Sequence, residues 1–172
     1  EEEAKKEHPQ KLRYVLRDLA TQEGAFAYEY TGYLANIYSV ETYYRSNIDM
    51  LESKKFYSLF SPNQKIYTKV KNEEPTYYAE SSKVSRSQFA SGSIVEGEVI
   101  NSVISRNTKI KTGSSVKHSV LFPRVKVGEN ATVEYAIVDK GVEIGEGVVI
   151  RGTAEDPIVV KKGQKVTEDI IR

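Results

Sequence analysis

His118 is the residue in this sequence best suited to catalysis, because an imidazole at a subunit interface can serve as a general base in acyl transfer. It is one of two histidines in the chain. Asn101 and Tyr135 lie one period of a sequence repeat before and after it, and we expect all three side chains to point outward from one column of that repeat. No residue that would orient the imidazole can be recognised. We therefore assign no catalytic residue and keep an acyltransferase with His118 as its base as the alternative function.

Aromatic residues gather between positions 28 and 44, in an arrangement that could bind a sugar. On one strand and one helix, however, such rings more often belong to a core or an interface, where they bury a large apolar area. We expect an interface here. The residues are Tyr28, Tyr30, Tyr33, Tyr38, Tyr43 and Tyr44.

Composition excludes several classes of function. The chain has no cysteine, which removes disulfides and thiolate metal sites, and we expect no metal site. Its 25 Lys and Arg against 24 Asp and Glu give a formal net charge of +1 without a basic stripe, so we expect no nucleic-acid partner. No apolar stretch of about 18 residues and no signal-peptide pattern occur, so we expect a cytoplasmic protein without membrane contact.

Any site must be positioned by a repeat that runs from Val99 to Ile150. Its period is constant and equals the distance along the sequence from Val99 to Val116. Gly113, Asn130 and Gly147 form one column of this repeat, and Gly and Asn enter the left-handed backbone region cheaply, so this column predicts a corner. Three columns carry large aliphatic residues, namely Val99, Val116, Val133 and Ile150; Ile104, Leu121 and Val138; and Ile110, Val127 and Ile144.

This pattern is typical of a hexapeptide-type parallel β-helix, which we expect to be left-handed and to contain about five coils. Apolar residues at intervals of 5 and 6 do not keep to one face of an α-helix, and the β-branched, Gly-rich composition disfavours helix. The fold class is therefore mainly β. The first coil is expected to begin near Val84.

Upstream of the repeat, the periodicity predicts a helix from Pro9 to Gly24, a strand over Ala25–Tyr33, a second helix capped by Ser39, and a short strand over Ile66–Val70. One helix, one strand and another helix do not make a domain. We therefore expect residues 1–55 to be the remnant of a larger α/β domain, 56–78 to be a connection and 79–172 to be the β-helix domain. The alternative is a small α/β cap on one end of the β-helix.

Residues 27–33 (Ala-Tyr-Glu-Tyr-Thr-Gly-Tyr) and 39–51 (Ser-Val-Glu-Thr-Tyr-Tyr-Arg-Ser-Asn-Ile-Asp-Met-Leu) resemble the end of the nucleotidyltransferase domain of glucose-1-phosphate adenylyltransferases, also called ADP-glucose pyrophosphorylases. Residues 75–78 (Pro-Thr-Tyr-Tyr), 98–103 (Glu-Val-Ile-Asn-Ser-Val) and 138–140 (Val-Asp-Lys) resemble the β-helix of that family. The resemblance implies that residues 1–55 come from a nucleotidyltransferase domain. It also implies a place in glycogen biosynthesis, in an oligomeric transferase.

Departures from the family pattern concern catalysis. Asn36 stands where catalytic members have an Asp that helps to hold Mg²⁺, and an uncharged amide should weaken that site unless Asn36 only occupies a turn. No Gly-rich phosphate-binding loop occurs before residue 92. The sequence thus resembles the C-terminal part of the non-catalytic, GlgD-type regulatory subunit. We expect this fragment alone to hold no cofactor and to make no ADP-glucose.

The resemblance also implies an effector site. In plant members a lysine of the segment matching residues 138–140 helps to bind a phosphorylated activator, and Lys140 matches it. Arg124 lies one repeat before Gly141 and is expected nearby, although a solvated side chain is the other reading of both residues. The expected partners are a catalytic adenylyltransferase subunit in a hetero-oligomer, or further copies associating through the β-helix. A trimeric hexapeptide-repeat acyltransferase, or a scaffold without any ligand, are the competing functions.

Overall fold

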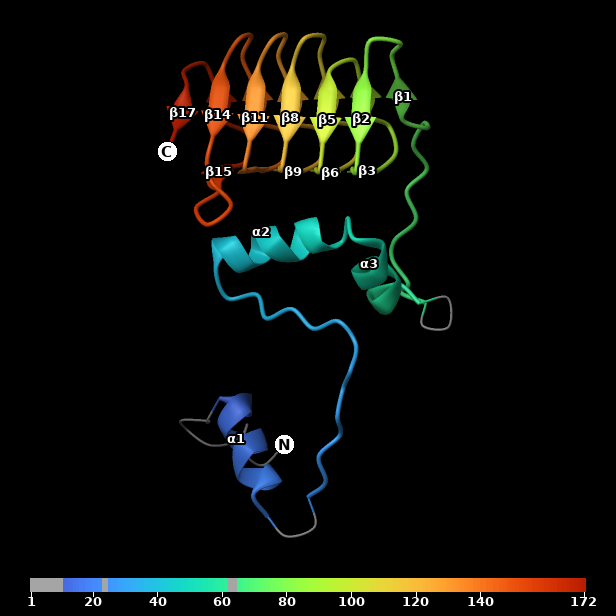
Figure 1. Cartoon of the computed structure of the whole chain (residues 1–172), viewed down its shortest axis with the longest axis vertical. Helices are drawn as coiled ribbons and strands as arrows, with labels where there is room; N and C mark the ends of the chain where they lie inside the picture. The colour runs from blue at the N-terminus through green and yellow to red at the C-terminus, as the bar shows by residue number, and fades with distance from the viewer. Residues whose placement is uncertain (1–10, 23–24, 62–64) are drawn as a thin grey trace. The chain divides into compact units, whose positions relative to one another are not determined.

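A computed structural model describes residues 11–22, 25–61 and 65–172 (Figure 1). The chain divides into two units, residues 1–32 and 33–172. In the first unit, α1 (Leu12–Ala20) confirms the predicted first helix. The expected ends of that helix at Pro9 and Gly24 lie outside the described residues.

Two predicted strands are absent from the described part of the chain. Residues 25–33 alternate as a strand should, but they pair with no neighbouring strand, and the side chains of Phe26 and Tyr28 are 97% and 89% exposed. A strand exists only in a ladder, so the correct period without a partner does not produce one. The segment 66–70 likewise lies outside every sheet.

Residues 77–171 form a parallel β-helix of three sheets, which confirms the fold predicted from the repeat. Sheet A contains β1 (Tyr77–Tyr78), β4 (Ile94–Val95), β7 (Lys109–Ile110), β10 (Lys126–Val127), β13 (Glu143–Ile144) and β16 (Lys165–Val166). Sheet B contains β2 (Lys83–Ser85), β5 (Glu98–Ile100), β8 (Ser115–Lys117), β11 (Thr132–Glu134), β14 (Val149–Arg151) and β17 (Ile170–Ile171). Sheet C contains β3 (Gln88–Phe89), β6 (Val103–Ile104), β9 (Val120–Leu121), β12 (Ala136–Val138) and β15 (Ile158–Val160).

The described part of the stack has about six coils, one more than the five predicted. The constant period fails at both ends. The coil from Val95 to its partner Ile110 is shorter than the regular one, whereas the coil from Glu143 to its partner Lys165 is longer and includes the turn at 153–157. The first strand, β1, lies at the end of the segment that was expected to be the connection.

The predicted aliphatic columns fill the interior of the coils. Parallel pairing places Val99, Val116, Val133 and Ile150 directly above one another, and none of the four is exposed. The residues of the other two columns are at most 3% exposed. Each such side chain contributes about 1.5–3 kcal/mol by leaving water.

The corners are where the chain turns between sheets, and their φ values explain their composition. Gly113, Asn130 and Gly147 have φ values of +73°, +56° and +67°, which confirms the predicted corner between sheets A and B. The same left-handed conformation occurs at His118 and Arg124, whose side chains make it costly, by about 1–2 kcal/mol for an L-residue.

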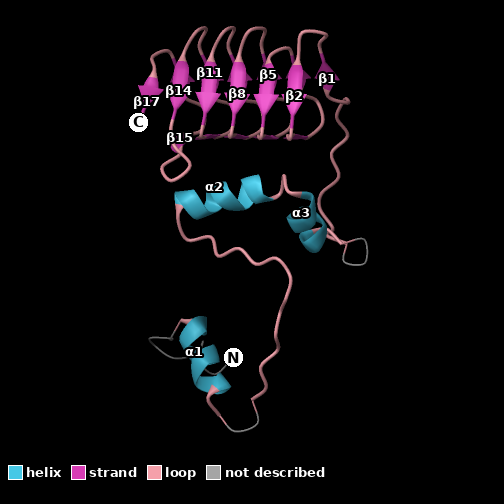
Figure 2. Cartoon of the chain, in the orientation of Figure 1, coloured by secondary structure: helices cyan, strands magenta, loops and turns pink. Residues whose placement is uncertain are grey.

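Helix α2 (Val40–Asp49) lies along sheet C, and α3 (Ser53–Leu59) follows it (Figure 2). The outer column of sheet C is apolar, and Val120 and Ile137 form a buried cluster with Tyr44 of α2. The Tyr44 hydroxyl donates to the backbone oxygen of His118 at 2.8 Å. The helix thus covers a side of the β-helix, not one of its open ends. No helix among the described residues is long and apolar enough to span a membrane.

The N-terminus of α2 is fixed by a capping box, which confirms the prediction that Ser39 caps this helix. The Thr42 amide donates to Ser39 Oγ at 3.1 Å, and the Ser39 amide donates to Thr42 Oγ1 at 3.0 Å. Replacing Ser39 by Ala is expected to cost about 1 kcal/mol and to lower hydrogen-exchange protection in the first turn of α2. Ser53→Ala, at the exposed start of α3, is the matched control and should leave α2 unchanged. Unaltered protection in Ser39→Ala would contradict this assignment.

Candidate functional site

The structure brings Arg124 and Lys140 into one pocket at the corner between sheets C and A. The pocket has a volume of about 220 Å³. Its further lining residues are Lys71, Glu73, Arg106, Asn107 and Pro123.

Stacking of the coils positions these cations. The Arg124 amide donates to the Arg106 oxygen and the Gly141 amide to the Pro123 oxygen, each at 3.0 Å, so successive turns lie directly on one another. Neighbouring parallel strands are about 4.8 Å apart, and a cation on each turn therefore faces the next. Arg124 has φ +64° in a column that elsewhere contains Gly92, Asn107, Gly141 and Gly163. Backbone strain at an exposed charged residue is more common at functional positions.

Glu73 compensates part of this charge. Its carboxylate lies 3.8 Å from Arg106 Nε and accepts hydrogen bonds from Asn107 Nδ2 at 3.2 Å and Ser91 Oγ at 3.3 Å. Among the described residues, Lys71, Arg124 and Lys140 form no ion pair. The pocket therefore presents three uncompensated cations, and the planar guanidinium of Arg124 can donate two hydrogen bonds to one phosphate or carboxylate.

His118 belongs to a corner ladder between sheets B and C. Asn101 Nδ2 lies 2.9 Å from His118 Nδ1, and the Tyr135 ring stacks on the imidazole with centroids 4.7 Å apart and planes 6° apart. An amide nitrogen only donates, so Nδ1 accepts and the proton of the neutral ring is on Nε2. In this state Nε2 cannot accept a proton from a substrate. The geometry favours a structural function for His118 over the base of an acyltransferase.

The tyrosine that binds the His118 backbone gives a pH prediction. Burial, and secondarily Tyr135, raise the pKa of Tyr44 above its ordinary value. The unfolded chain loses this proton near pH 10 and the folded chain only at higher pH, so the resulting stability is complete below about pH 10 and declines above it. We expect Tyr44 to ionise above the ordinary range for tyrosine in a spectrophotometric titration.

Tyr44→Phe provides the control for this titration. It should remove the late-ionising group and the hydrogen bond to His118, at a cost of about 1 kcal/mol near neutral pH. A titration curve of the variant that keeps its late phase would show that Tyr44 is not the late group.

The surroundings of Asn36 do not fit a magnesium ion. A pocket of about 170 Å³ contains Asn36, Arg45 and Asp49. Both Asp49 oxygens are already engaged, since Oδ1 accepts from Lys55 Nζ at 2.6 Å and Oδ2 from Tyr33 OH at 3.1 Å. The bond to Asp49, followed by that to Glu52, raises the pKa of Lys55, so the ammonium stays in place. Mg²⁺ prefers charged oxygen ligands, and here a guanidinium lies beside a neutralised carboxylate. No group of three or more His, Cys, Asp or Glu in the described ranges could hold a metal ion.

Residues 69–171 match the family model described as GlmU-like, C-terminal hexapeptide. The match covers the whole β-helix and more than half of the chain. The chain belongs to this hexapeptide family. Its membership agrees with the three parallel sheets and with the corner residues described above.

The chain is also similar to several longer proteins. "Glycogen biosynthesis protein GlgD" of Bacillus subtilis (strain 168) is 41% identical over 136 residues, or 79% of this chain and 40% of the relative. The protein of the same name from Geobacillus stearothermophilus is 50% identical over 127 residues, or 74% of this chain and 37% of the relative. "Glucose-1-phosphate adenylyltransferase" of Mycoplasma mobile is 35% identical over 99 residues, or 58% of this chain and 25% of the relative. The chain thus spans about two fifths of the GlgD proteins.

The structure adds Lys71, Glu73 and Arg106 to the two residues expected at the site. Arg106 precedes Lys140 by two full periods of the repeat, so the repeat alone could have placed it in the same corner. Lys71 and Glu73 precede the first coil of the family fold and follow no period. Their position depends on the path of the connecting segment, where the Gly92 amide donates to the Glu74 oxygen at 2.6 Å.

Proposed function

We propose that this chain is the C-terminal part of a GlgD-type regulatory subunit of glucose-1-phosphate adenylyltransferase. In that role it contributes to subunit assembly and to the control of ADP-glucose synthesis for glycogen. The cationic corner pocket carries the proposal, because it offers an anion site on a chain whose Asn36 region does not fit catalytic magnesium. Identity of 41% and 50% to two GlgD proteins supports the same subunit type.

The pocket is the proposed effector site, with Arg124 and Lys140 binding a phosphorylated metabolite. Three cations without carboxylate partners match the several negative oxygens of a phosphate, and Arg124 adds a planar, bidentate donor. Glu73 holds Arg106 and Asn107 in place. Its negative charge repels anions, so the pocket should bind only ligands that carry a strong negative charge.

The proposed partner is a catalytic adenylyltransferase subunit, with self-association through the β-helix as the further possibility for assembly. The parent protein would act in the cytoplasm. The fragment by itself would be no enzyme and would hold no cofactor. Similarity to a glucose-1-phosphate adenylyltransferase over 58% of the chain supports this choice of partner.

The test is co-purification of the complete parent protein with the catalytic subunit of the same organism, followed by assay of ADP-glucose formation. A mixed complex whose rate or effector response differs from that of the catalytic subunit alone supports the proposal. Lys140→Gln in the parent should leave the complex intact and weaken the effector response, whereas Lys54→Gln, an exposed lysine of α3, should change neither. Failure of the two chains to associate, together with acyl-CoA binding by trimers of this chain, would overturn it.

A further inference from the structure

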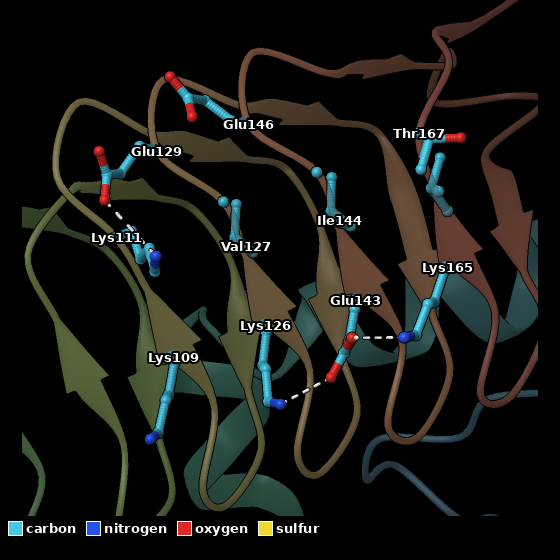
Figure 3. A pocket seen from close by; sticks show the side chains of 13 residues that line it. Lys109, Lys111, Lys126, Val127, Glu129, Glu143, Ile144, Glu146, Lys165 and Thr167 are labelled. Atoms are coloured by element: carbon cyan, nitrogen blue, oxygen red, sulfur yellow. Dashed lines mark hydrogen bonds and ion pairs between the residues drawn. The ribbon is translucent and has the colours of Figure 1, made fainter.

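The outer face of sheet A contains a trough of about 360 Å³ along β10, β13 and β16 (Figure 3). Gly128 and Gly145 leave its floor without side chains. On one side runs the column Lys126, Glu143 and Lys165, in which Glu143 pairs with Lys126 at 2.6 Å and with Lys165 at 3.7 Å. The row of three long side chains thus lies beside a row in which the two glycines are followed by Thr167.

The two corners that border sheet A have opposite charges. In the turns that lead from sheet A to sheet B lie Glu129, Glu146 and Glu168, which we call the acidic corner. In the turns that lead from sheet C to sheet A lie Arg124, Lys140 and Lys162, which we call the basic corner.

Pairing of the strands places these charges at matching heights. Lys126 pairs with Glu143 and Glu143 with Lys165, so each coil contributes one residue to each corner. The amide of Gly147 donates to the Glu129 oxygen, and that of Gly163 to the Lys140 oxygen, which keeps both corners in register. The coils are about 4.8 Å apart. Arg124 is therefore level with Glu129, Lys140 with Glu146 and Lys162 with Glu168.

Within one copy these charges remain largely uncompensated. Glu129 has one contact with a cation, Lys111 Nζ at 3.5 Å. The other five corner residues form no ion pair with any described residue. Sheet A separates the two corners, so they can compensate each other only between molecules.

A half-turn about an axis parallel to the stack supplies this compensation. Such a rotation preserves the height of every residue and brings the acidic corner of one copy opposite the basic corner of the other, at both edges of the face. A half-turn about an axis perpendicular to the stack would set like corners against each other, which opposes association. The trough provides room for the column of long side chains from the facing copy, as an isologous interface requires.

We propose that the chain pairs with a second copy of itself through sheet A, with the two β-helices parallel and the acidic corner of each facing the basic corner of the other. This inference specifies the surface for the self-association named above. Because Arg124 and Lys140 also line the effector pocket, bound phosphate should weaken the pairing. Because the corner contacts are ionic and lie at the rim, added salt should weaken the dimer, with about a tenfold rise in dissociation constant between low and high salt.

The test is a charge exchange followed by sedimentation velocity. Glu129→Lys with Glu146→Lys gives a chain that is basic at both corners, and Lys140→Glu with Lys162→Glu gives one that is acidic at both. Each variant alone should dimerise about a hundredfold more weakly than the unaltered chain, because like charges then face each other. An equimolar mixture of the two variants should restore a dimer.

Glu29→Lys with Glu155→Lys is the matched control, since both residues are exposed and neither belongs to sheet A or to its corners. It should dimerise as the unaltered chain does. Persistence of the dimer in either charge-reversed variant, a monomeric mixture, or a monomeric unaltered chain at low salt would each overturn the proposal. The acidic-corner variant leaves the effector pocket intact and removes the carboxylates that face it in the dimer, so it should bind phosphate at least as tightly as the unaltered chain. Failure of pairing is thereby distinguished from failure of the proposed effector site.

Discussion

Replacing Arg124 by Gly should make the protein more stable by about 1 kcal/mol while weakening the binding of inorganic phosphate by about tenfold. The gain arises because φ at this position is +64°, a conformation that Gly adopts without strain and that three glycines already adopt in the same column. The loss arises because the guanidinium lines the pocket with Lys140. Chemical denaturation and titration with phosphate measure the two effects separately.

Arg124→Gln separates strain from charge. It keeps a side chain at the left-handed position, so it should lose phosphate binding without gaining stability. Gly141→Ala, which adds a side chain to an open position with φ +66°, should destabilise the protein and leave phosphate binding largely intact. A Gly substitution at 124 that leaves phosphate affinity unchanged would remove Arg124 from the proposed effector site.

Leu121→Ala should cost about 3 kcal/mol, the largest effect that a single truncation of the interior is expected to produce here. Leu121 is completely buried in the middle of the stack, paired with Ile104 on one side and Val138 on the other. Neither neighbour can move into the space without breaking its own pairing, so most of the cavity remains. The free energy of unfolding in urea measures this cost.

Val159→Ala is the comparison for the Leu121 variant. This residue is on the outer face of sheet C and is 46% exposed, so its truncation should cost less than about 0.5 kcal/mol. A similar loss in both variants would mean that the interior of the stack is not the main source of stability.

Periodicity explains which features could be predicted from the sequence. A parallel β-helix repeats the same environment in each coil, so the buried positions of Val116 and Val133 follow from spacing alone. The same reasoning placed Arg124 beside the turn of Lys140. It underestimated the number of coils, because the first and last coils depart from the regular period.

Features that depend on a partner outside the repeat were not predictable. The residues over 25–33 have the period of a strand, but strand formation requires a neighbour that no local pattern reveals. Lys71 and Glu73 reach the pocket only because the connecting segment passes that corner. Likewise, the hydrogen bond from Asn101 that fixes the tautomer of His118 depends on side-chain geometry between coils.

The course of α2 along sheet C bears on how the molecule unfolds. A repeat stack held only by nearest-neighbour contacts can lose coils one at a time from its ends. Here Gln88 Nε2 of the first coil donates to the Met50 oxygen at the end of α2, while Tyr44 bonds to His118 and packs with Ile137 in later coils. Loss of a single coil therefore strains or breaks contacts that belong to several others. The helix links the coils it crosses into one cooperative unit, so that this part of the stack melts together and fraying is confined to the coils beyond it.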